Sequence, residues 1–133
     1  GAIMAAAAFM GNAFDIYVTN DATANIVIAN PVDFTSFKVI RVSVFNSSGT
    51  NNFRLTDGTN DICASQATVS AAWKDMVINP THSTILSADT LTIVSPTATM
   101  SQIILHCIGA DVDGDNEGMI SYLSCVSKQL SVG

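Results

Sequence analysis

Charged side chains are scarce in this sequence. They make up 12% of its 133 residues, against about 25% in a typical globular domain. Eleven acidic and five basic residues give a net charge of −6. Nucleic acids and anionic membrane surfaces are bound by clustered Lys and Arg, so no nucleic-acid or membrane partner is expected. Depletion of Lys and Glu is typical of interface cores, which favours a subunit packed against other proteins over a monomer with an uncharged surface.

Residues that favour helices are also few: one Glu (Glu117), three Lys and six Leu. β-Branched residues are abundant instead, with thirteen Ile, twelve Val and thirteen Thr. Branching at Cβ restricts these side chains in a helix but suits the pleated surface of a sheet. Composition therefore predicts an all-β protein, and a hydrophobic content of 48% excludes a disordered chain.

Cysteine is rare and has no metal-binding spacing. The three cysteines, Cys63, Cys107 and Cys125, form no CxxC pair and cannot all pair within one chain. They are interpreted as free and mostly buried thiols of a protein made in a reducing cytosol. One disulfide with a spare thiol is the alternative.

The N-terminal residues are apolar and rich in Ala, and no segment reaches the roughly 18 apolar residues of a membrane span. The basic start of a signal peptide is lacking. Residues 1–13 are predicted to form an arm on a neighbouring subunit, ahead of a single β-sandwich domain of residues 14–133. A disordered or internally packed leader is the alternative. The large apolar side chains expected at the oligomer or shell interface are Ile3, Met4, Phe9, Met10 and Phe14.

Alternating apolar residues and turn signals predict about eight or nine short strands, spaced by roughly ten residues. In the clearest strand, Ile40, Val42 and Val44 fall on one face and Val39 on the other. This spacing predicts an antiparallel β-sandwich, with a jelly roll favoured. The candidate segments for these strands are 14–19, 25–29, 37–46, 53–56, 62–64, 73–79, 84–86, 90–95, 100–108 and 119–127.

An acidic loop offers the most suggestive candidate for metal binding. Asp111, Asp113, Asp115 and Glu117 alternate between residues 109 and 118. Carboxylates spaced in this way can converge on Ca²⁺, which takes six to eight oxygen ligands. The glycines and the last ligand position depart from an EF-hand loop, so a solvated acidic loop is the favoured alternative. No other cofactor is expected.

Catalytic patterns are lacking elsewhere. His106 and Cys107 are neighbours on an expected strand and must point to opposite faces. No serine lies in a GxSxG elbow, and an enzyme is not expected. The single tryptophan, Trp73, is a possible glycan-binding platform, although packing between the sheets is favoured.

Two segments carry a resemblance to a known class of proteins. They read FKVIRVSVFNSSGTNNFRLTDGTNDICA and STILSADTLTIVSPTATMSQIILHCIGA. In their Val/Ile alternation, turns and Ser/Thr/Asn-rich composition they resemble small β-sandwich virion proteins of tailed bacteriophages. The resemblance implies a capsid decoration (cement) protein, made in the bacterial cytoplasm and carried on the capsid surface. Its implied partners are the major capsid protein or other virion proteins and its own copies, a trimer being favoured. The alternative is a tail, fibre or knob adhesin or another glycan-binding module.

Overall fold

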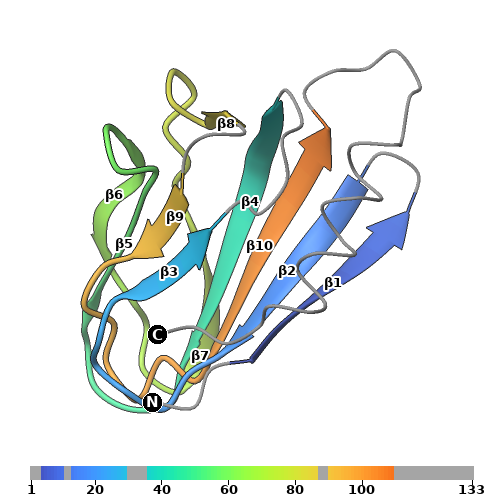
Figure 1. Ribbon diagram of the computed structural model, residues 1–133. Coiled ribbons are helices and arrows are strands. Elements are labelled where there is room, and N and C mark those ends of the chain that lie inside the picture. The colour runs from blue at the N-terminus through green and yellow to red at the C-terminus, as the bar shows by residue number, and fades with distance from the viewer. Residues whose placement is uncertain (1–3, 11–12, 30–35, 87–89, 110–133) are drawn as a thin grey trace.

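The protein is an all-β antiparallel sandwich of two facing sheets (Figure 1). The computed structural model describes residues 4–10, 13–29, 36–86 and 90–109, which form ten strands and no helix. The predicted fold class is therefore confirmed. Every strand predicted between Phe14 and Ile108 is present with slightly shifted ends. The last predicted strand, residues 119–127, lies outside the described residues.

The larger sheet has six strands and the smaller has four. The larger sheet runs in the order β1 (Met4–Met10), β2 (Ala13–Thr19), β10 (Gln102–Gly109), β4 (Ser36–Asn46) and β7 (Ala72–Met76), with β8 (Thr84–Leu86) also paired to β4. The smaller sheet runs in the order β3 (Ile26–Ala29), β9 (Thr90–Ile93), β5 (Asn52–Thr56) and β6 (Asp61–Ala67).

Most connections cross from one sheet to the other. The chain crosses between β2 and β3, β3 and β4, β4 and β5, β6 and β7, β8 and β9, and β9 and β10. Only β1–β2, β5–β6 and β7–β8 connect strands of the same sheet. Residues distant in sequence therefore become neighbours in a sheet. β2 and β10, for example, pair over their whole length, from Gln102 opposite Thr19 to Ile108 opposite Ala13.

One hydrophobic core fills the space between the sheets. Strict alternation in β2 and β10 sends every second side chain inward, as the pleat of a strand requires. The largest fully buried side chains come from both sheets and from the loop before β10: Phe53, Ile16, Ile26, Leu55, Ile62, Leu91, Ile93 and Met100. The alternate residues of the larger sheet are left on its outer face.

A β-bulge in β4 changes which residues of that strand face the core. His106 lies opposite Arg41, but the next residue, Cys107, lies opposite Val39, so Ile40 is the extra residue. Val39 is fully buried, whereas Ile40 is 48% exposed. The predicted alternation is correct for Val42 and Val44, which are buried. It is wrong for Val39 and Ile40, because the bulge exchanges their faces.

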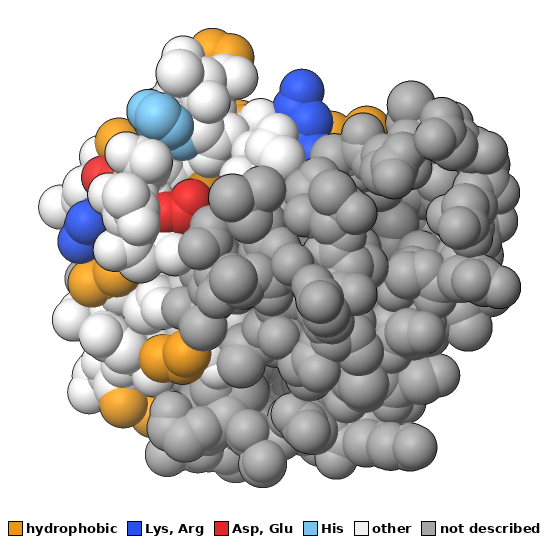
Figure 2. All heavy atoms as spheres, turned by 45° about the horizontal axis from the view of Figure 1, so that its top comes forward, with side chains coloured by type: hydrophobic (Ala, Val, Ile, Leu, Met, Phe, Trp, Pro, Cys, Tyr) orange, Lys and Arg blue, Asp and Glu red, His pale blue; other side chains and the backbone are white. Residues whose placement is uncertain are grey.

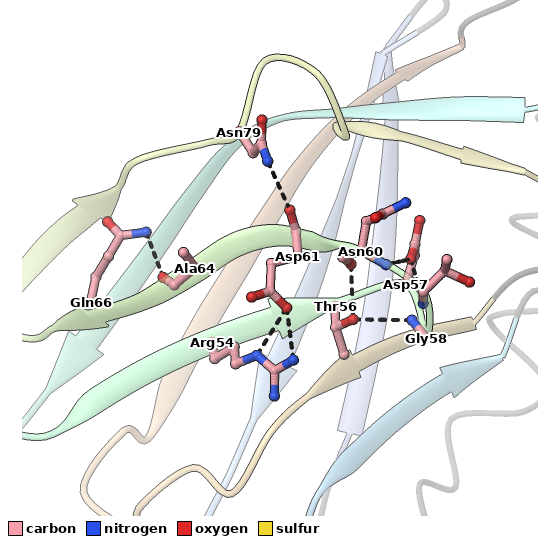
Figure 3. Close-up of polar contacts among 10 residues, drawn as sticks. Arg54, Thr56, Asp57, Gly58, Asn60, Asp61, Ala64, Gln66 and Asn79 are labelled. Atoms are coloured by element: carbon pink, nitrogen blue, oxygen red, sulfur yellow. Dashed lines mark hydrogen bonds and ion pairs between the residues drawn. The ribbon is translucent and has the colours of Figure 1, made fainter.

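The hairpin predicted around Asp57 and Gly58 is present between β5 and β6 (Figure 3). The Asp57 carboxylate accepts the backbone N–H groups of Thr59 and Asn60 at 2.9 and 2.7 Å. The Thr56 hydroxyl accepts the Gly58 N–H at 3.1 Å and donates to the Asn60 carbonyl at 2.9 Å. Gly58 has a φ of 95°, which residues with a side chain rarely adopt. The turn thus connects β5 to β6, its antiparallel neighbour in the smaller sheet.

Candidate functional site

The four residues predicted to bind a metal ion belong to the acidic loop between residues 109 and 118. Asp111, Asp113, Asp115 and Glu117 lie outside the described residues. Among the described residues, no three His, Cys, Asp or Glu side chains are grouped so as to hold a metal ion. Calcium binding by the acidic loop therefore stays a prediction.

The predicted N-terminal arm overlaps the edge strand of the chain's own sheet. β1 pairs with β2, with Met4 opposite Thr19 and Phe9 opposite Phe14. Met10 ends β1 opposite Ala13, and Ile3 lies outside the described residues. That these residues also contact a neighbouring subunit stays a prediction.

Trp73 lies on the outer face of the larger sheet and is 47% exposed. It pairs across the strands with Phe45 of β4, and the two ring centroids are 5.6 Å apart at an interplanar angle of 51°. Tilted contacts of this kind hold two aromatic rings in a defined orientation. The prediction that Trp73 packs between the sheets is wrong, because its position in β7 points it away from the core.

Strand register arranges the outer face in rows. Each row takes one residue from each of the strands β2, β10 and β4, and the first two rows extend to β7. The rows are Thr19–Gln102–Phe45–Trp73, then Tyr17–Ile104–Ser43–Asp75, then Asp15–His106–Arg41. Aromatic side chains therefore lie toward one end of the face and ionisable side chains toward the other.

The aromatic end of this face is hollowed. The hollow has a volume of about 330 Å³ and is lined by Tyr17, Val18, Thr19, Trp73, Gln102, Ile103 and Ile104. Tyr17 is 41% exposed, and its hydroxyl donates to the Asp15 carboxylate at 3.2 Å. The Asp15 charge and, to a lesser degree, burial raise the pKa of Tyr17 above its ordinary value, so the phenol stays neutral. Tyr17 and Trp73, each held by a contact with a neighbouring side chain, thus flank the hollow.

The ionisable end holds a network of hydrogen bonds that crosses four strands. His106 Nδ1 is 2.9 Å from Asp15 Oδ1, and because a carboxylate only accepts, Nδ1 is the donor. His106 Nε2 lies 3.3 Å from Arg41 Nη2, which can only donate. The Ser43 hydroxyl donates to Asp75 at 2.7 Å. These contacts tie β2, β10, β4 and β7 together on the side away from the core.

Asp15, His106 and Ser43 contact one another in the order that serine hydrolases use. His106 Nε2 and Ser43 Oγ are 3.3 Å apart. In a hydrolase the serine hydroxyl donates to the histidine, which then removes its proton. Here the shorter contact of the Ser43 hydroxyl is the one to Asp75, at 2.7 Å, and His106 Nε2 also lies 3.3 Å from Arg41 Nη2. The arrangement supports a cross-strand structural network, and the absence of enzymatic activity stays a prediction.

This network could not be found from the sequence alone. Its members come from four strands, and they are brought together by the register of β10 with β2 and β4 and by the register of β4 with β7. The predicted separation of His106 from Cys107 is confirmed. His106 lies on the outer face beside Asp15, and Cys107 is buried in the core.

Cys63 and Cys107 are free thiols buried in the core, as predicted for these two cysteines. Burial, with a smaller contribution from the charge of Asp61, raises the pKa of Cys63 from 9.0 to about 12. Burial and then Asp15 raise the pKa of Cys107 well above its ordinary value. Thiolates are the reactive form of cysteine, so both side chains are chemically inert in the folded protein.

Comparison with known proteins finds no relative of this chain. No protein-family model, curated protein or solved structure matches the chain. Within the described ranges, no helix is both long and apolar enough to span a membrane. The chemistry of the outer face therefore has to be inferred from its own geometry.

Proposed function

We propose that this chain is a structural virion protein, a capsid decoration subunit that acts through protein–protein contacts. The supporting observation is the exposure of large apolar side chains at one edge of the sandwich. Trp73 lies on β7, an edge strand of the larger sheet, with Val69 before this strand and Val77 directly after it. Val69, Trp73 and Val77 are 47%, 47% and 73% exposed. Apolar side chains left exposed along an edge strand offer a surface that another protein can cover.

The scarcity of charge supports the same proposal. Figure 2 shows one side of the molecule, where the charged side chains of the described residues lie singly among uncharged atoms. Such a surface is covered at a low cost of desolvation, because few ions lose their water. A stable contact between subunits buries roughly 1,000 Å² or more. We propose a homo-oligomer, with a trimer favoured, that binds the major capsid protein or another virion protein.

We also propose that the sandwich is a jelly roll. Its support is the strand orders β2-β10-β4-β7 and β3-β9-β5-β6, in which strands from the two halves of the chain interleave in both sheets. Double-sheet jelly rolls occur in viral capsid proteins and in lectins. β1 adds a further strand at one edge of the larger sheet, where a neighbouring subunit can contact it.

The oligomer is tested by native mass spectrometry of the purified chain and of a Val69→Lys/Val77→Lys variant. We expect the parent chain to be a trimer. We expect the variant to dissociate at least about tenfold more readily, because two charges are placed in the contact. Val27→Lys, on β3 of the other sheet, is the matched control, since Val27 is 43% exposed. A parent chain that is monomeric at micromolar concentration would contradict the homo-oligomer.

Attachment to a shell is tested by sedimentation. The purified chain is mixed with empty shells of the major capsid protein encoded in the same genome. We expect the chain to sediment with the shells at a saturating, fixed ratio, and the Val69→Lys/Val77→Lys variant to remain in the supernatant. If the genome encodes no such capsid protein, or if the chain never sediments with its shells, the decoration function is wrong.

A further inference from the structure

We propose that the hollow between Tyr17 and Trp73 on the outer face of the larger sheet binds a neutral carbohydrate. The sugar ring stacks against Tyr17 and Trp73, the aromatic walls of the hollow. Its hydroxyl groups form hydrogen bonds with Gln102 and Thr19, the polar side chains of its floor. Trp73 belongs both to this site and to the apolar edge at Val69 and Val77, but the sugar site does not depend on the virion function.

The two aromatic walls are already oriented in the free protein. Phe45 holds the Trp73 ring through a tilted contact with centroids 5.6 Å apart. Asp15 holds the Tyr17 hydroxyl at 3.2 Å. Side chains that are fixed before binding lose little conformational entropy when a ligand arrives. The faces of aromatic rings carry negative charge density, which attracts the slightly positive C–H groups of a sugar ring.

The floor supplies hydrogen-bonding groups that have no partner within the described chain. The Gln102 amide, the Thr19 hydroxyl and the Trp73 indole N–H make no hydrogen bond to any described residue, and Gln102 and Thr19 are exposed. An amide both donates and accepts, and a hydroxyl does the same. Neighbouring hydroxyl groups of a sugar both donate and accept hydrogen bonds, so they need partners of both kinds. Ile104, opposite Tyr17 in the next row of the sheet, offers an apolar surface for the remaining C–H groups.

The charge and the size of the hollow select the class of ligand. None of the seven described residues that line it is charged at neutral pH, so a phosphate, a carboxylate or a metal ion finds no counter-charge among them. Its volume of about 330 Å³ is at the small end of ligand sites, which hold roughly 300–1,000 Å³. One or two sugar rings fit this space. An extended peptide would need a longer groove.

Tryptophan fluorescence tests the site directly, because Trp73 is the only tryptophan in the chain. The full chain is titrated with glucose, galactose, mannose, N-acetylglucosamine, maltose, cellobiose, lactose and chitobiose. A proline-rich peptide is titrated in parallel. We expect at least one saccharide to shift or quench the emission saturably, with a dissociation constant of about 1 mM or lower.

Three variants test whether a change in tryptophan emission comes from binding in this hollow. Gln102→Ala and Tyr17→Ala keep the reporter and should each weaken binding about tenfold or more. Val27→Ala, exposed on the other sheet, should change it less than about twofold. Circular dichroism checks that each variant is folded, and Gln102→Ala removes no side chain from the core.

Three results would overturn the site. The first is that no saccharide changes the emission up to about 10 mM. The second is that Val27→Ala weakens binding as much as Gln102→Ala. The third is a response to the proline-rich peptide alone, which would make the hollow a peptide groove.

Discussion

Replacing Val39 by aspartate will prevent the protein from folding stably, whereas the same replacement at Ile40 will leave its melting temperature almost unchanged. Val39 is fully buried between the sheets, and its neighbour Ile40 is 48% exposed on the outer face. A carboxylate at position 39 would be buried without a partner, at a cost of several kcal/mol. Small domains are stable by only about 5–15 kcal/mol, so this loss is decisive.

The measurement is urea and thermal denaturation followed by circular dichroism. Because Val39→Asp is expected to be insoluble, Val39→Ala and Ile40→Ala form the quantitative pair. We expect a loss of about 2 kcal/mol for Val39→Ala, from lost burial and the cavity left behind. We expect a loss of less than about 0.5 kcal/mol for Ile40→Ala, as at most exposed positions. If Ile40→Ala is instead the more damaging change, β4 alternates without the bulge and the register described here is wrong.

The sequence pattern was enough to predict the sandwich and its strands from β2 to β10, but not β1 as an edge strand of the chain's own sheet. Alternation is a local property, and turn signals such as Asp57-Gly58 mark where a strand must end. The bulge in β4 is not local. It exists because β10 pairs opposite Arg41 with His106 and then opposite Val39 with Cys107, and nothing in residues 37–46 alone specifies that shift. A single inserted residue exchanges the faces of Val39 and Ile40.

The candidate site was less predictable for the same reason. Trp73 was recognised as a possible platform from its residue type, but its exposure depends on the position of β7 at the edge of the sheet. Tyr17 and Gln102, which complete the hollow, come from β2 and β10. They meet because the chain crosses between sheets several times before β10 returns to lie beside β2. Residue types alone therefore suggested one wall of the site, and the strand order supplied the rest.

Alkaline pH should destabilise the protein strongly, through thiols that cannot ionise in the folded state. Burial raises the pKa of Cys63 from 9.0 to about 12, and the charge of Asp61 adds to this. The unfolded chain releases the thiol proton near pH 9, whereas the folded chain retains it up to about pH 12. The folded state then binds more protons than the unfolded state, so the free energy of unfolding falls as pH rises between these values.

The expected loss from Cys63 is large for a single side chain. Each pKa unit corresponds to about 1.4 kcal/mol, so the contribution approaches about 4 kcal/mol by pH 12. The pKa of Cys107 is raised by its burial first and by Asp15 second, and that of Tyr17 by Asp15 first and by burial second. Both shifts act in the same direction. The stability due to these groups is fully present below about pH 9 and is lost above it.

Urea denaturation at about pH 8 and about pH 11, under reducing conditions, measures this effect, with Cys63→Ala as the comparison. The parent chain and the variant share every other group that titrates at alkaline pH. At pH 8 the parent chain should be the more stable, because alanine leaves a cavity in the core. By pH 11 the difference in unfolding free energy should shift by about 3 kcal/mol in favour of Cys63→Ala, which has no thiol to ionise when it unfolds. Parallel losses in the two proteins would mean that Cys63 ionises in the folded state. A thiol at that position would then be open to solvent, and the packing of β6 against the core would have to be revised.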